Sequence, residues 1–177
     1  MSEKIDTKAR PTIGLSAGMF DEEGKLLLKR RTEKESLPRD WDLPGGAVEA
    51  ENNAKTDDEW IVAKELSREI EEETGLKIPI DTIGRMPIMH PVVIKGGDDW
   101  AFVIAVAGNY GDPSKGEFKY VSPEELKELA NGPQGNRLVS GWRKRMSRLA
   151  LLAFTHSPNE EYRKQAWLYL EDILSRP

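Results

Sequence analysis

The chain has 177 residues, of which 38% are hydrophobic and 32% charged, with no cysteine and two histidines. This length supports one domain with a core of its own, and the composition is typical of a soluble globular protein. The lack of cysteine excludes disulfides and thiolate metal sites, and it fits a reducing, cytoplasmic location. Two histidines are too few for a histidine-rich zinc site, so oxygen ligands and hard cations are the expected metal chemistry.

Most of the excess negative charge lies in one short segment. The formal net charge is −5, and segment 57–73 alone holds eight acidic and two basic residues. A solvated helix face is the ordinary interpretation of such a run, but like charges one turn apart destabilise a helix. A bound divalent cation would supply the counter-charge. The overall acidity argues against nucleic acid as a main partner.

The first elements in chain order are a tail, a hairpin and a loop. Residues 1–10 are polar, lack the apolar stretch of a secretory signal and are expected to form a flexible tail. Residues 12–20 and 25–29 are apolar with a turn sequence between them, which predicts a β-hairpin. Residues 30–40 are charged and are expected to form a loop. The chain contains no apolar run of transmembrane length, so no membrane contact is expected.

A glycine turn and a helix follow. Residues 41–43 form a short extended unit, and Gly45 and Gly46 after a proline predict a turn that allows close backbone approach. A helix is expected to run from Asp57 or Asp58 to about Thr74, with Gly75 just after its end. Apolar residues at every fourth position form its buried stripe: Val62, Leu66 and Ile70.

The next part of the chain has strand character. Residues 76–94 are expected to be extended, with turns at Asp81 and Gly84. The run 100–107 is strongly apolar and is expected to be a central strand, because a strand buried on both faces needs no alternation of polar residues.

Helices close the chain. A short strand at 117–121 precedes Ser122, which is expected to cap a helix. Two more helices are expected at about 136–155 and 159–175. This order of elements predicts one domain over 11–177, with a mixed sheet and helices on its faces.

The acidic helix can present several carboxylates on one side. At 100° per residue, Glu69, Glu72 and Glu73 share an arc of about 100°. Arg68 can pair with Glu72 one turn later. The three carboxylates are expected to converge beside Gly45-Gly46. Mg²⁺ takes oxygen ligands and shares its coordination with substrate phosphates, so this arrangement suits it.

These residues carry a specific resemblance. Residues 68–76, Arg-Glu-Ile-Glu-Glu-Glu-Thr-Gly-Leu, match the second half of the box of the Nudix (MutT-like) hydrolase family at every defined position. Residues 43–49 resemble the usual approach to that box, and 117–126 resemble a later strand and helix start. The resemblance covers roughly 12–130. It implies an α/β (α+β) fold, a Nudix-type α/β/α sandwich with a mixed β-sheet. The helices expected at about 136–177 extend beyond the resemblance and form a C-terminal helical extension.

The resemblance also implies roles for individual residues. Glu69, Glu72 and Glu73, with the carbonyl of Gly46, would bind Mg²⁺, for which Mn²⁺ can substitute. Arg68 would orient a glutamate. The following residues complete the implied site: Gly45 and Gly46 as substrate-binding backbone, and Glu117 as an additional catalytic base or metal ligand.

One departure from the family pattern lies before the helix. Arg68 follows Gly46 by 22 positions, about eight more than the pattern allows. The first glutamate of the box is therefore either Glu59 or Glu51. The insertion falls in a polar loop that could border the site and alter substrate choice.

Several functions remain open at this point. The favoured one is Mg²⁺-dependent hydrolysis of a nucleoside triphosphate, possibly a damaged one, to the monophosphate and pyrophosphate. ADP-ribose, to which Pro91 is a weak pointer, other nucleotide sugars and dinucleoside polyphosphates are alternatives. A non-catalytic nucleotide sensor would have no need of the three box glutamates. The C-terminal helices either cover the sheet or form a homodimer contact. Four tryptophans are expected in the core, although one could stack on a base: Trp41, Trp100, Trp142 and Trp167.

Overall fold

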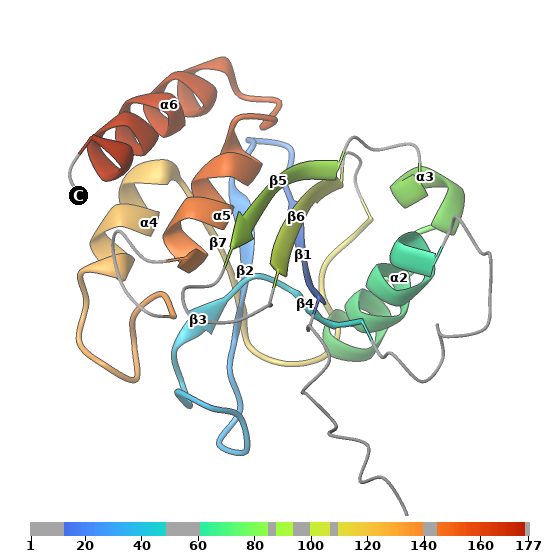
Figure 1. Cartoon of the computed structure of the whole chain (residues 1–177). Helices are drawn as coiled ribbons and strands as arrows, with labels where there is room; N and C mark the ends of the chain where they lie inside the picture. Colours follow the sequence, from blue (N-terminus) through green and yellow to red (C-terminus); the bar gives the residue numbers. More distant parts are fainter. Residues whose placement is uncertain are drawn as a thin grey trace, which may run out of the picture.

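The computed structural model describes residues 13–48, 61–84, 88–93, 100–106, 110–139 and 145–175. These residues form two β-sheets that lie between two groups of helices (Figure 1). The strands are β1 (Ile13–Met19), β2 (Leu26–Arg30), β3 (Trp41–Asp42), β4 (Gly45–Ala47), β5 (Ile88–Val93), β6 (Trp100–Val106) and β7 (Phe118–Val121). The helices are α2 (Ile61–Thr74), α3 (Ile80–Gly84), α4 (Pro123–Ala130), α5 (Arg145–Phe154) and α6 (Glu160–Leu174). The alternatives Glu51 and Glu59 and the proposed caps Asp57 and Asp58 lie outside the described residues.

The larger sheet is mixed. Its strand order is β4-β1-β6-β5, with β6 in the interior, as predicted for the apolar run that forms it. Strands β1 and β6 are parallel, whereas β4 and β5 join their neighbours antiparallel. A parallel pair needs a crossover connection, and the chain between β1 and β6 contains α2. The crossover therefore places the acidic helix against this sheet.

The predicted hairpin is only partly correct. Asp21 N–H donates to the carbonyl of Lys25 and a single bridge joins Phe20 to Leu26, so the turn exists. Beyond that bridge the two strands separate. β1 pairs with β4 and β6, and β2 joins a three-stranded sheet of order β3-β2-β7. Each strand finds longer partners elsewhere, so the short local pairing does not extend.

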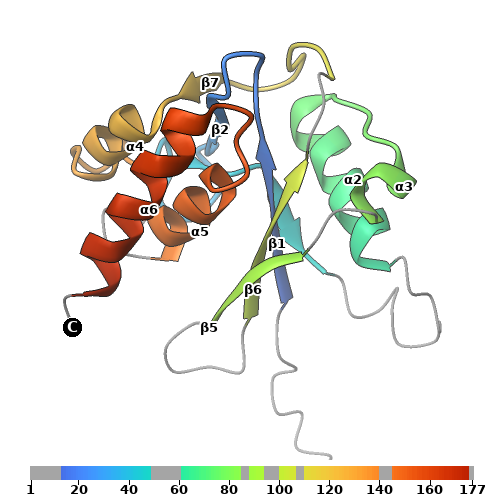
Figure 2. The same cartoon turned by 90° about the horizontal axis from the view of Figure 1, so that it is seen from above.

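The helices cover both faces of the sheets. Figure 2 shows α2 and α3 on one side and α4, α5 and α6 on the other. Two apolar clusters match these layers, one including Leu66 and Ile70 of α2 and the other including Leu149 and Phe154 of α5. The predicted sandwich of a mixed sheet between helices is confirmed.

Two predicted elements need correction. Residues 76–84 are not a strand, because α3 begins after Pro79, whose carbonyl accepts from Thr82 and Ile83. A short apolar segment does not by itself distinguish a strand from a buried turn of helix. The helix predicted from residue 136 begins at Arg145 instead, and Leu138 forms an extended bridge to Trp41. The predicted helix start at Ser122 is confirmed, because Ser122 and Glu125 form a capping box.

The outer face of α6 carries exposed apolar side chains. Trp167 is 52% exposed, contrary to the expectation that it packs in the core, and Leu168 and Leu174 are also exposed. Trp41 is buried as predicted. The side chains of Trp100 and Trp142 lie outside the described residues. Among the helices that the structure describes, none has the length and apolar character needed to cross a membrane.

Candidate active site

Helix α2 is anchored at its apolar stripe and at its C-terminal end. Leu66 and Ile70 are fully buried, as the four-residue spacing predicts. Gly75 ends the helix with a positive φ of 78°, and its N–H donates to the carbonyl of Glu71. The carbonyl of Thr74 accepts from Ser114, which ties the helix end to the loop before β7. The charged face of α2 is thereby held against β4 and β2.

Gly45 and Gly46 lie in a strand rather than in the predicted turn. In β4 they pair antiparallel with β1, Gly45 opposite Ser16 and Gly46 opposite Leu15. Gly45 has φ 147°, and a Cβ there would lie 2.1 Å from the carbonyl oxygen of Leu15. Pairing with β1 holds the two glycines in an extended conformation. Because glycine has no side chain, the backbone of Gly45 can lie this close to the backbone of Leu15.

The carboxylate of Glu69 lies directly against Gly46. A Cβ at Gly46 would be 2.3 Å from the carboxyl carbon of Glu69 and about as close to both of its oxygens. The glycine is therefore needed for this carboxylate to reach the strand. The close approach connects the glycine segment with the box helix, as the sequence predicted.

Glu73 contacts the neighbouring residue of the same strand. Its Oε2 accepts a hydrogen bond from the N–H of Gly45 at 2.8 Å, and its Oε1 pairs with the ammonium group of Lys29 in β2. Burial raises the pKa of Glu73, although Lys29 and the Gly45 N–H oppose the shift. Lys29 was not predicted, since it lies 44 positions from Glu73 and no local pattern links the two.

Arg68 pairs with three carboxylates of the helix. Its guanidinium donates to Glu72 at 2.9 Å, which confirms the predicted pair, and also to Glu69 at 2.6 Å and to Glu65 at 2.9 Å. The hydrogen bonds that Arg68 donates to Glu65 and Glu72 raise the pKa of Arg68 above its ordinary value. Glu65 was not predicted, although its position three residues before Arg68 places it on the same face.

The three box glutamates do not converge on one point as expected. Glu72 is exposed and bound by Arg68, whereas Glu73 is bound by Lys29 and Gly45. In the part of the chain that the structure describes, no three acidic or histidine side chains form a group that could hold a metal ion. Arg68 and Lys29 form ion pairs with the carboxylates that would otherwise bind a metal ion.

Two of these carboxylates nevertheless suit a hard divalent cation. Glu69 and Glu73 both border the glycines of β4, where a side chain on Gly46 would fill the space. Carboxylate and backbone carbonyl oxygens are the ligands that Mg²⁺ prefers. The donor chemistry at this strand therefore fits such an ion.

A cavity of about 490 Å³ lies next to the end of α2. A Cβ on Gly116, which lines it, would lie 3.7 Å from the carbonyl oxygen of Glu73. Glu117 is half-exposed at its rim and pairs with Arg30 at 2.7 Å. The remaining lining residues are Arg31, Thr32, Glu33 and Arg39. Arg30 also lines the cavity. Each of the three arginines is paired with a carboxylate, Arg30 with Glu117, Arg31 with Asp42 and Arg39 with Glu33. The three arginines were not predicted.

The loop that carries these arginines has an unusual backbone. Leu37 and Arg39 have φ values of 53° and 64°, which residues with a side chain rarely adopt. Backbone hydrogen bonds between Arg31 and both Arg39 and Asp40 hold the loop closed. Such conformations persist where the surrounding structure enforces them, often at binding sites.

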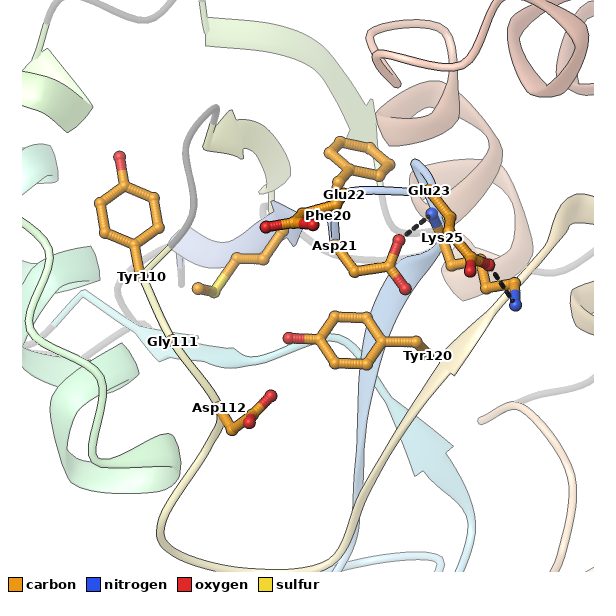
Figure 3. Close-up of a pocket in the computed structure, with 10 residues that line it drawn as sticks. Phe20, Asp21, Glu22, Glu23, Lys25, Tyr110, Gly111, Asp112 and Tyr120 are labelled. Carbon is orange, nitrogen blue, oxygen red and sulfur yellow. Dashed lines mark hydrogen bonds and ion pairs between the residues drawn. The ribbon is translucent and has the colours of Figure 1, made fainter.

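A second cavity, of about 540 Å³, lies at the turn between β1 and β2 (Figure 3). Tyr110 and Tyr120 border it, together with Asp21 and Asp112. Burial raises the pKa of Tyr120, and the two aspartates push it in the same direction. The residues that line this cavity come from β1, the turn, β7 and the loop before it, and none of them belongs to α2. It is therefore separate from the box carboxylates.

Comparison with known proteins places the chain in a family. The family model described as NUDIX domain matches residues 10–142, and the chain belongs to the NUDIX family. By family it is a Nudix hydrolase, a class that acts on nucleoside diphosphate-linked compounds. No curated protein matches the chain.

Several solved structures are similar. A nudix hydrolase family member from Chromobacterium violaceum has 17% identity and a TM-score of 0.51, over 94% of this chain and 95% of that one. A MutT protein from Methanosarcina mazei Go1 has 24% identity and a TM-score of 0.47, over 71% and 87%. An ADP-ribose pyrophosphatase from Streptococcus suis 89-1591 has 19% identity and a TM-score of 0.45, over 84% and 95%. The first of these likenesses supports the fold, and its coverage extends beyond the family match into the C-terminal helices.

Proposed function

We propose that the protein is a Mg²⁺-dependent hydrolase that cuts the phosphoanhydride of a nucleoside triphosphate, with water, to give the monophosphate and pyrophosphate. The observation that carries the proposal is the placement of Glu69 and Glu73 against the β4 glycines, within a matched NUDIX domain. Mn²⁺ can replace Mg²⁺ in this role, because both accept oxygen ligands.

The residues of the box have different proposed roles. Glu69 and Glu73, together with the carbonyl of Gly46, would hold the metal at β4, and Glu72 would be a further ligand in place of its pair with Arg68. When bound, the metal supplies Lewis-acid activation of water and neutralises charge on the departing phosphate. Arg68 is a positioning residue, since its guanidinium contacts both Glu69 and Glu72. Gly45 orients Glu73 through its N–H.

The arginine-lined cavity supports a substrate with several negative charges. Arg30, Arg31 and Arg39 face a space next to the end of the box helix. Guanidinium groups bind phosphate oxygens by paired hydrogen bonds, so a polyphosphate suits these arginines if it takes the place of their carboxylate partners. Glu117, at the rim, is the proposed additional base or ligand, and its ion pair with Arg30 would have to open for that role.

The test is a hydrolysis panel with Mg²⁺ that covers triphosphates, oxidised triphosphates, ADP-ribose, other nucleotide sugars and dinucleoside polyphosphates. Products are identified by mass spectrometry. We expect a monophosphate and pyrophosphate from a triphosphate, and no products with EDTA or in Glu72→Gln. Cleavage of ADP-ribose or a nucleotide sugar instead would reassign the substrate. No turnover with folded protein, and with Mn²⁺ also tried, would contradict the triphosphate proposal and favour nucleotide binding without cleavage.

A further inference from the structure

We propose that Lys29 is a resident counter-ion of the metal site, which a divalent cation displaces from Glu73 and which Glu35 then receives. The inference rests on the proposed function, because it assumes that Glu73 binds metal. It concerns residues of this chain outside the box. It makes Lys29 a positioning residue that decides how readily the metal enters.

The strand geometry aims Lys29 at the box helix. Side chains alternate between the two faces of a strand, so Lys29 shares a face with Leu27 two positions earlier. Leu27 is fully buried in the cluster that includes α2. Lys29 therefore extends from the same face, where its ammonium meets Glu73. Only 10% of its side chain is exposed.

Because the Lys29 ammonium group is buried, it requires a carboxylate partner. An ammonium group removed from water costs free energy unless a carboxylate compensates it. The same holds for Glu73, whose side chain is 21% exposed. In the metal-free protein each group satisfies the other. This pair explains how the fold tolerates the glutamate without a metal.

Glu35 is a second acceptor already in place. Its Oε1 lies 3.4 Å from the ammonium nitrogen of Lys29. Its other oxygen accepts the N–H of Thr32 at 2.6 Å, which fixes the side chain within the arginine-bearing loop. Arg31 approaches Glu35 at 3.7 Å as well. Lys29 thus lies between a carboxylate of the box and a carboxylate of the loop.

Electrostatic repulsion determines how Lys29 responds when a divalent cation binds Glu73. A metal ion and an ammonium on the same carboxylate repel each other strongly at short range. Lys29 can lower this repulsion by moving fully to Glu35, which needs only a small displacement of a flexible side chain. Metal binding is therefore an exchange, and its equilibrium contains the free energy of breaking the Lys29–Glu73 pair.

The experiment measures binding of Mn²⁺ alone by isothermal titration calorimetry, without substrate or turnover. In Lys29→Gln the competing cation is gone, so we expect binding about tenfold tighter. In Glu35→Gln the displaced lysine loses its acceptor, so we expect binding about threefold weaker. The matched control is Lys25→Gln, which removes a positive charge just before β2. Lys25 pairs with Glu23 rather than with a box glutamate, and we expect a change of less than about twofold.

The double variant separates exchange from a general electrostatic effect. If Lys29 passes to Glu35, removing Glu35 has no effect once Lys29 is gone, and Lys29→Gln/Glu35→Gln binds Mn²⁺ like Lys29→Gln. Independent changes would multiply instead. Multiplying effects, or an equal gain in Lys25→Gln, would overturn the exchange.

The outcomes also separate this inference from the proposed function. A wild-type protein that binds no Mn²⁺ would contradict the metal site itself. A wild-type protein that binds Mn²⁺, with unchanged affinity in Lys29→Gln, would overturn the role of Lys29 alone. Circular dichroism checks that each variant is folded. If Lys29→Gln does not fold, Glu35→Gln on the half-exposed loop still decides the question, and unchanged affinity there overturns the exchange.

Discussion

Helices α2 and α5 pack on opposite sides of the sheets and differ in how they use charge. α5 is held by apolar burial, with Leu149, Leu151 and Phe154 fully inaccessible. α2 buries Leu66 and Ile70 in the same way, but it also buries Glu65. Buried charge lowers stability unless partners compensate it. Packing accounts for α5, whereas α2 retains carboxylates that its packing does not require, and such departures tend to mark functional sites.

The largest expected effect on stability comes from a change in the apolar packing of α5. Phe154→Ala removes a fully buried ring that contacts Phe20 and Tyr162. We expect a loss of about 3–5 kcal/mol of unfolding free energy. Activity per folded molecule should be unchanged, because the ring is on the opposite side of the sheets from α2. Urea denaturation and active-site-normalised rates check both parts, and a rate that falls in the still-folded variant would contradict the separation.

Glu69→Gln tests the role of the α2 carboxylates. The amide keeps the shape of the side chain but is a poor metal ligand, so we expect kcat/KM to fall about 100-fold or more, which corresponds to several kcal/mol. Stability should change by less than about 1 kcal/mol. Steady-state kinetics and urea denaturation are compared. A variant that keeps most of its rate would place the metal elsewhere.

Gly46→Ala and Gly45→Ala form a matched pair one residue apart. A methyl group on Gly46 meets the flexible end of Glu69, whereas one on Gly45 meets the backbone of Leu15. We expect Gly46→Ala to lower kcat/KM about 30-fold with the fold intact, about 2 kcal/mol in the transition state. Gly45→Ala should lower the melting temperature instead. Equal effects on stability would show that the two glycines serve the strand alone.

Glu73→Gln tests how a buried carboxylate of α2 affects the stability of the metal-free protein. Burial raises the pKa of Glu73 above 4.5, its ordinary value. Folding therefore favours the protonated carboxyl, and the stability of the metal-free protein falls as the pH rises from 4.5 through the folded-state pKa. The amide removes this pH dependence, so we expect the metal-free variant to lose less stability than the wild-type protein between pH 4.5 and pH 7. Thermal unfolding at pH 4.5 and pH 7, without metal, measures the two losses. A variant whose stability falls as much as that of the wild-type protein between these pH values would contradict the account.

Trp167→Gln should have the smallest effect. The ring is half-exposed on α6, so we expect a stability change within about 0.5 kcal/mol and unchanged activity. Leu170→Ala on the buried face of the same helix is the control, with an expected loss of about 2–5 kcal/mol. If Trp167→Gln lowers stability as much as the control does, the outer face of α6 has a packing role.

Local patterns in the sequence predicted local structure well. The buried stripe of α2, its end at Gly75, the cap at Ser122 and the pair of Arg68 with Glu72 all depend on neighbours within a few positions. The fold class followed from the order of the elements and from the family resemblance. Local periodicity and capping are therefore sufficient to place the box helix.

Long-range contacts were the part that the sequence could not supply. The pairing of Lys29 with Glu73 and the bridge of Leu138 to Trp41 join segments far apart in the chain. The separation of β1 and β2 into two sheets depends on strands that come later. The convergence of the three glutamates was expected from helix geometry alone, which omits the cations that hold them apart. The cytoplasmic location, the absence of a nucleic acid partner and the homodimer stay predictions.

The most direct test of the central claim follows turnover of a nucleoside triphosphate by phosphorus NMR while the metal is removed and returned. The account predicts that wild-type protein with Mg²⁺ forms monophosphate and pyrophosphate, stops when EDTA is added, and resumes when Mg²⁺ exceeds the chelator. Glu69→Gln, folded by circular dichroism, should form neither product at a comparable rate. Turnover that continues in EDTA, or that survives in Glu69→Gln, would contradict a metal-assisted reaction at the α2 carboxylates.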